Sequence, residues 1–273
     1  MPTHCGCILT EEELLGLAAN VLTRVLSSSG CPTTAWVSGS MVEGLGNPSS
    51  DIDIFVALPQ IGPSLPTTRR NLDHSTYATV EGGRRFDVEY WSEEKIGDLA
   101  NKLAEAPIAD PMSNTLHYFE YWETEFIHRI LVGLPLLNEE AFMRLRGCFN
   151  RRRLGAYLAT NAIHRVDDAF DDTVGMLLGG DLDCAVLRAR DTVEFSIDAM
   201  LYANGVTNDK TKFRPTKVKR LLEEQPDFRR HLSRLWHFQS LPVGMEERRA
   251  YVEDALRYSS ELVEYVQLGM AGG

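Results

Sequence analysis

The feature that most constrains the fold is the order along the chain of two hydrophobic patterns, one typical of strands and one typical of helices. Short apolar or alternating runs, typical of β-strands, all lie before residue 92, and apolar residues at helical spacing dominate from residue 93 onward. Gly82-Gly83 suits the positive φ angles of a tight turn, so the runs on either side of it are expected to form a hairpin. The expected strands are 33–37, 51–58, 77–80 and 84–91.

The helical periods predict an opening helix at 11–29, with Thr10 as its N-cap, and a long series of helices after the strands. A short helix is expected at 41–45, a loop at 59–74, and the end of the sheet near residue 91. The later helices are expected at 96–103, 115–132, 139–148, 154–178, 182–204, 216–224, 228–238 and 246–268.

This layout is that of an α+β protein whose second half is entirely helical. Gly133, Pro135 and Asn138 interrupt the helical pattern, which places the expected domain boundary near residue 135. The two expected domains are therefore 1–135, which carries the sheet, and 136–273, a helical bundle.

Composition and charge exclude several classes of protein. The 273 residues are 44% hydrophobic and 25% charged, which is typical of soluble globular proteins. No apolar run is long enough to span a bilayer and no secretory signal pattern begins the chain, so a cytoplasmic location is expected. The net charge of −11 disfavours binding of long nucleic acids and more easily accommodates a small cationic molecule.

Two carboxylates are the first candidates for chemistry. Asp51 and Asp53 are separated by one residue on an expected strand, so both side chains project from the same face. Their mutual repulsion is relieved if a cation lies between them, and hard oxygen ligands suit Mg²⁺ that also contacts phosphates. Two solvated acids on an exposed edge strand remain the alternative.

A possible phosphate-binding turn precedes these acids. In Val37-Ser38-Gly39-Ser40 a strand ends at a glycine, which lets a phosphate approach the backbone, and at a serine, which offers a hydroxyl and an amide. The amides at the start of the expected helix 41–45 would also face the anion. Gly39 and Ser40 are therefore candidate nucleotide-binding residues.

The combined pattern resembles the signature of the DNA polymerase beta superfamily of nucleotidyltransferases. Gly39-Ser40, a spacer, and Asp51-Ile52-Asp53 match its glycine, its glycine or serine, and its acid, apolar residue and acid. The family has a third acid on a later strand, a place that Asp87 fits, with Glu89 on the same face as second choice. The resemblance implies a small mixed sheet with flanking helices and, as in the antibiotic-modifying members, a helical domain that closes over nucleotide and acceptor.

The resemblance implies a magnesium-dependent enzyme. Two Mg²⁺ ions held by Asp51, Asp53 and Asp87 would bind ATP, and AMP would pass to a hydroxyl of a small molecule such as an aminoglycoside or another natural product. Asp87 or Glu89 could accept the hydroxyl proton. The alternatives are modification of an RNA end or a protein side chain, and a non-catalytic nucleotide-binding module; the protein is expected to be a monomer or homodimer.

The densest basic tract supplies candidates for binding the triphosphate. Lys210, Lys212, Arg214, Lys217, Lys219 and Arg220 surround Pro215, which is expected to start a helix. Arg214 and Lys217 are the residues expected to contact the phosphates, and a solvated helix face is the alternative.

Overall fold

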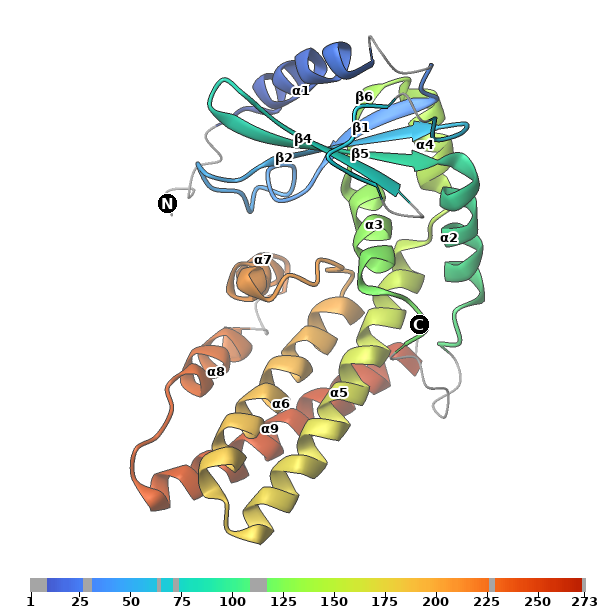
Figure 1. Ribbon diagram of the computed structural model, residues 1–273. Coiled ribbons are helices and arrows are strands. Elements are labelled where there is room, and N and C mark those ends of the chain that lie inside the picture. Colours follow the sequence, from blue (N-terminus) through green and yellow to red (C-terminus); the bar gives the residue numbers. More distant parts are fainter. Residues whose placement is uncertain are drawn as a thin grey trace. The chain divides into compact units, whose positions relative to one another are not determined.

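A computed structural model describes residues 9–26, 31–62, 65–70, 74–108, 117–225 and 229–271 (Figure 1). The chain divides into two compact units: Met1–Glu105 with Tyr121–Asn150, and Ala106–Glu120 with Arg151–Gly273. The main break along the chain lies between Asn150 and Arg151, later than the boundary near residue 135. The assignment of 1–135 and 136–273 as domains stays a prediction.

The first unit contains a mixed sheet, as expected. In the described residues the strand order is β3-β4-β5-β2-β1-β6, in which β2 and β5 run parallel and the other neighbours run antiparallel. This confirms the α+β fold with a small mixed sheet. The strands are β1 (Thr34–Ser38), β2 (Ile52–Leu58), β3 (Arg69–Arg70), β4 (His74–Glu81), β5 (Arg84–Ser92) and β6 (Leu134–Leu137).

Two of these strands were not expected. The sheet does not end near residue 91, because β6 pairs with β1 at the edge of the sheet. Pro135 has no N–H group to donate, which an edge strand tolerates. In the sequence, the same proline looks like a simple interruption of the helical pattern. The expected loop 59–74 contains β3, which pairs with β4; residues 63–64 and 71–73 lie outside the described residues.

One face of the sheet packs against the opening helix, α1 (Glu11–Leu26). The backbone amide of Thr10 donates to Glu13, and the amide of Glu13 donates to the hydroxyl of Thr10, so the helix begins with the reciprocal capping arrangement. Its buried side chains meet alternate residues of three strands. This hydrophobic core includes Leu14, Ala18, Val21, Leu22 and Val25 from the helix and Val37, Ile52, Ile54, Val56, Phe86, Val88 and Tyr90 from the sheet.

An aromatic cluster covers part of the opposite face. Trp36 stacks on Phe55 with ring centroids 5.4 Å apart, and Phe126 lies 4.0 Å from Trp91. Phe142 completes the cluster at 5.5 Å from Trp36. Phe126 belongs to α3 (Tyr121–Val132) and Phe142 to α4 (Glu139–Gly147). The cluster therefore packs both helices against the face of the sheet that lies opposite α1.

The expected short helix at 41–45 is instead a series of turns. The amide of Glu43 donates to the carbonyl of Gly39 at 3.0 Å, but the amides of Leu45 and Gly46 both donate to the carbonyl of Ser40 at 2.8 Å. Gly44 has a φ of 63°, in the left-handed region. A shared acceptor and a left-handed residue stop helical propagation, so the helix-end contribution to phosphate binding does not apply.

The second half of the chain is helical from residue 139, as the apolar periods predict. In the second unit α6 packs against both α5 and α9. Helix α3 begins at Tyr121, and the expected residues 115–116 lie outside the described range. The remaining helices are α2 (Glu93–Glu105), α5 (Arg151–Gly179), α6 (Leu182–Ala203), α7 (Arg214–Glu224), α8 (Arg229–Gln239) and α9 (Met245–Ala271).

Across the part of the chain that the structure describes, no helix combines the length and apolar character needed to cross a membrane.

Candidate active site

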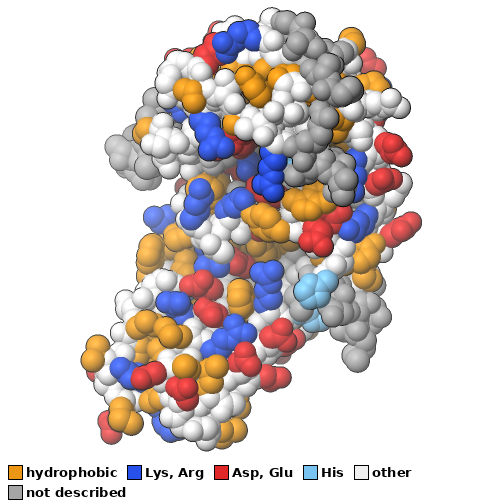
Figure 2. All heavy atoms as spheres, viewed as in Figure 1, with side chains coloured by type: hydrophobic (Ala, Val, Ile, Leu, Met, Phe, Trp, Pro, Cys, Tyr) orange, Lys and Arg blue, Asp and Glu red, His pale blue; other side chains and the backbone are white. Residues whose placement is uncertain are grey.

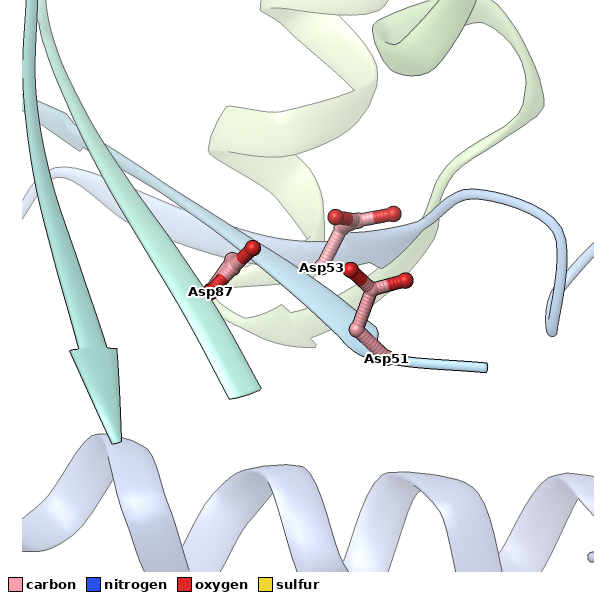
Figure 3. Close-up of side chains that lie close together, drawn as sticks. All are labelled: Asp51, Asp53 and Asp87. Atoms are coloured by element: carbon pink, nitrogen blue, oxygen red, sulfur yellow. The ribbon is translucent and has the colours of Figure 1, made fainter. Parts of the chain in front are cut away.

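Three carboxylates converge at the start of the two parallel strands. Asp51 directly precedes β2, Asp53 lies within it, and Asp87 is the register partner of Asp53 on β5. One oxygen from each residue lies within 4.8 Å of the others, and the side chains project from the same side of the strands (Figure 3). Three hard oxygen donors at this separation suit Mg²⁺ or Mn²⁺. The donor set therefore fits a divalent cation.

The alternation of the strands explains this convergence. Ile52 and Ile54 flank Asp53 and are fully buried in the core beneath α1, as are Phe86 and Val88 on either side of Asp87. Because successive side chains point to opposite faces, burial of these apolar residues forces the carboxylates to the other face. The acids are consequently held by the same register that forms the core.

Gly39 brings a backbone turn directly against the acids. It has a φ of +93°, and a Cβ atom there would lie 2.1 Å from an oxygen of Asp53 and 2.2 Å from a guanidinium nitrogen of Arg129. Only glycine fits this position without displacing both groups. Ser40 follows, and its carbonyl accepts two amides of the turn; its contact with phosphate stays a prediction.

Two arginines neutralise part of the acidic charge. Arg129 on α3 donates to Asp53 at 2.9 Å and to Glu125 at 3.1 Å. Arg85 donates from two nitrogens to the two oxygens of Asp87, at 2.9 and 2.8 Å, and its side chain is 61% exposed. Arg129 could not be predicted from the sequence, because it lies 76 residues from Asp53 and on a helix with no phosphate or metal motif.

Burial makes two carboxyl groups of the site weaker acids than they are in water. Burial raises the pKa of Asp53 from 3.8 to about 6; Arg129 opposes this shift, and the charges of Asp51 and Asp87 add to it. Burial also raises the pKa of Glu89 from 4.5 to about 7, with a further contribution from Asp53. Both groups therefore titrate close to neutral pH.

Glu89 lies beside the cluster of three rather than within it. It projects from the same face of β5 as Asp87, and its carboxylate accepts a hydrogen bond from the indole of Trp91 at 3.1 Å. The cluster that could hold a metal among the described residues consists of Asp51, Asp53 and Asp87. Of the two candidates for the third acid, Asp87 has the geometry of a ligand.

Comparison with known families bears on this site directly. Residues 19–108, which include the Gly39 turn and the three aspartates, match the family described as "Nucleotidyltransferase domain". The match supports the superfamily resemblance and general nucleotidyl transfer.

A solved structure supports the fold. The chain is similar to a nucleotidyltransferase-like protein from Exiguobacterium sibiricum, with a TM-score of 0.51, 9% sequence identity, and coverage of 92% of this chain and 76% of that one. At this identity the likeness concerns the fold alone. No curated protein matched the chain.

The two predicted phosphate ligands outside residues 19–108 have partners within the second unit. The guanidinium of Arg214 donates to both oxygens of Asp198, at 2.9 and 2.8 Å, and to Glu194 at 2.7 Å. Lys217 is buried, and its ammonium donates to the backbone carbonyl of Asn208. These contacts support a structural role for both cations. Their contact with a nucleotide stays a prediction.

The raised pKa values predict how stability depends on pH. A carboxyl group with a higher pKa in the folded chain stabilises it fully below its unfolded pKa and loses this contribution as the pH rises through the folded pKa. For Asp53 the window runs from 3.8 to about 6, and for Glu89 from 4.5 to about 7. The shift of Asp53 corresponds to at most about 3 kcal/mol.

We therefore expect the unfolding temperature of the chelator-treated protein to fall between about pH 5 and about pH 8, and millimolar Mg²⁺ to raise it more at the higher pH. Thermal unfolding across this range, with and without Mg²⁺, measures both effects. The variant Glu89→Gln removes one titrating group and should flatten the fall near pH 7. An increase in unfolding temperature by Mg²⁺ that is equal at the two pH values would contradict the idea that protons and Mg²⁺ compete for the same carboxylates.

Proposed function

We propose that this protein transfers a nucleoside monophosphate, AMP from ATP, to a hydroxyl group of a small molecule such as an aminoglycoside or another natural product, with release of pyrophosphate. The observation that carries the proposal is the cluster of Asp51, Asp53 and Asp87 against the Gly39 turn, within a segment that matches the nucleotidyltransferase domain. A structural or purely regulatory module has no need for three converging carboxylates, which repel one another without a cation.

In this proposal Asp51, Asp53 and Asp87 hold two Mg²⁺ ions. Magnesium at such a site neutralises phosphate charge and makes a bound hydroxyl more acidic. The three carboxylates supply the negative charge and the oxygen donors, while the φ of Gly39 and its missing Cβ leave the backbone open to a phosphate group.

The chain also offers a group for proton removal. The acceptor oxygen forms a bond to the α-phosphorus. At the same time the bond breaks between that phosphorus and the oxygen that bridges it to the β-phosphorus, so that pyrophosphate leaves. The hydroxyl proton passes to a carboxylate. Glu89 suits this role, because its pKa of about 7 leaves a substantial ionised fraction at neutral pH and it lies on the same face as the cluster. Asp87 is the alternative base, although it is also a proposed metal ligand.

The charge of the chain supports a small acceptor. The net charge is −11, which opposes the approach of a polyanion and attracts a cation such as an aminoglycoside. On the face shown in Figure 2, basic and acidic side chains are interspersed. Binding of long nucleic acids depends on a local concentration of positive charge. The cytoplasmic location and the state of monomer or homodimer stay predictions.

A transfer assay tests the proposal. The protein, ATP labelled at the α-phosphorus and Mg²⁺ are incubated with separate acceptors: a panel of aminoglycosides and other polyhydroxylated natural products, a short RNA, and an unrelated protein. We expect release of pyrophosphate and label on a small molecule, both abolished by a chelator. Label on the RNA or protein would replace the small-molecule assignment, and metal-dependent ATP binding without pyrophosphate release from any acceptor would indicate a non-catalytic module.

A further inference from the structure

We propose that Arg129 is a positioning residue that orients the carboxylate of Asp53 for binding of a divalent cation. This inference rests on the proposed function, because it concerns the same metal site. It assigns a role to a residue outside the three acids and the Gly39-Ser40 turn.

Arg129 holds the carboxylate of Asp53 through one of its oxygens. One guanidinium nitrogen lies 2.9 Å from Oδ2 of Asp53, and a second lies 3.1 Å from Glu125, one helical turn earlier on α3. The guanidinium is planar and presents its donors in a fixed fork, so two simultaneous acceptors define its orientation. Oδ2 of Asp53 is thereby held by a guanidinium of defined orientation, which restricts the rotation of the carboxylate beside the cluster.

Arg129 is itself fixed to the Gly39 turn. Its backbone carbonyl accepts a hydrogen bond from the hydroxyl of Ser38 at 2.8 Å, directly before Gly39. The neighbouring His128 lies 3.1 Å from Glu43, on the other side of the same turn. Helix α3 is further held by Phe126 within the aromatic cluster. The helix that carries the guanidinium is therefore held beside the turn by two contacts, with Ser38 and with Glu43.

Gly39 provides the space for this contact. The Cβ of any other residue would collide with both Oδ2 of Asp53 and the guanidinium of Arg129, at 2.1 and 2.2 Å. The absence of a side chain at Gly39 thus serves the ion pair beneath it as well as the approach of a phosphate. Side chains of Arg129 and Asp53 are only 15% and 16% exposed, so solvent weakens their interaction little.

Arg85 provides the matched comparison. It donates to both oxygens of Asp87, whereas Arg129 donates to one oxygen of Asp53, but its side chain is 61% exposed and has no described carboxylate partner other than Asp87. Because the side chain of Arg85 is largely exposed, solvent screens this pair, and removal of Arg85 should act mainly through the loss of charge. Loss of charge alone should strengthen cation binding at an acidic site, whereas loss of a positioning contact should weaken it. The direction of the change therefore separates the two roles.

Binding of Mn²⁺ to the full chain without nucleotide tests the inference, measured by electron paramagnetic resonance at about pH 8. We expect Arg129→Met to weaken Mn²⁺ binding at least tenfold, the lower end of the effect of removing a partner of a metal ligand. Arg129→Lys, which keeps the charge but not the fork, should recover part of the affinity. Arg85→Met should bind Mn²⁺ as tightly as the unaltered protein or more tightly.

The outcomes are distinct for the two proposals. Equal or tighter Mn²⁺ binding by both Arg129 variants overturns the positioning role and leaves the proposed function intact. Failure of the unaltered protein to bind Mn²⁺ overturns the metal site, and with it both proposals. If circular dichroism shows that Arg129→Met does not fold, Arg129→Lys decides the matter by its affinity relative to the unaltered protein and to Arg85→Met.

Discussion

The variant Asp53→Asn should release pyrophosphate from ATP roughly a thousandfold more slowly than the unaltered protein. A metal-bound transition state is stabilised by several kcal/mol relative to the reaction without metal, and each 1.36 kcal/mol corresponds to a factor of ten in rate. Asp53 belongs to the cluster of three acids and also pairs with Arg129. An amide at this position therefore removes a proposed metal ligand and breaks an ion pair at the same time. Its steady-state turnover at saturating Mg²⁺ and ATP is the measurement.

The control for this substitution is Asp98→Asn. Asp98 is an exposed residue of α2 in the same unit and makes the same change of charge. It should retain full turnover, and both variants should show the circular dichroism of the unaltered protein. Turnover of Asp53→Asn within tenfold of the control would contradict the assignment of Asp53 as a metal ligand.

The variant Arg214→Met should lower the free energy of unfolding by about 3–5 kcal/mol. Removal of one partner of a buried ion pair leaves an uncompensated charge, which is the costly event. Arg214 and Asp198 are 5% and 6% exposed, and Asp198 would lose both of its guanidinium donors. Urea denaturation monitored by circular dichroism measures the change.

Lys219→Met is the matched control for Arg214→Met. Lys219 lies on the same helix, α7, and is exposed, so its loss should change stability by less than about 0.5 kcal/mol. A stable Arg214→Met variant with a greatly raised KM for ATP would instead support the nucleotide contact predicted from the sequence. The two measurements therefore separate the structural role of Arg214 from the binding role.

The sequence predicts the acidic cluster because its geometry is local. The alternation of Asp51, Ile52 and Asp53 sets two carboxylates on one face whatever the tertiary fold. Asp87 could be added because the apolar residues Phe86 and Val88 on either side of it must be buried, which fixes its direction once β5 joins the same sheet. Only the resemblance to a known superfamily, however, indicated that β5 lies next to β2.

Other parts of the site depend on contacts that the sequence does not record. Arg129 reaches Asp53 through the packing of α3 on the aromatic face, and neither residue carries a signal of the other. The basic tract around Pro215 shows a related limit, because composition cannot distinguish an exposed cation from a buried one. The partners that bury Arg214 are Glu194 and Asp198, which lie four residues apart on α6.

The turn after β1 shows the limit of local propensity. Residues 41–45 have a helical composition, yet Gly44 adopts a left-handed conformation and the carbonyl of Ser40 accepts two amides. The positive φ of Gly39, beside Asp53 and Arg129, sets the course of the chain into this segment. Tertiary constraint therefore overrides the weak preference of a five-residue segment.

The parallel pairing of β2 and β5 has a consequence for how the protein could change over time. A deletion of one residue in the turn between Glu81 and Arg84 would shift β5 by one position, which would turn Asp87 inward and Phe86 and Val88 outward. Chemistry and folding would be lost in the same event. Length changes in the segment 59–68, which joins β2 to β3, leave that alignment untouched, so natural variation should accumulate there and be excluded from the hairpin turn.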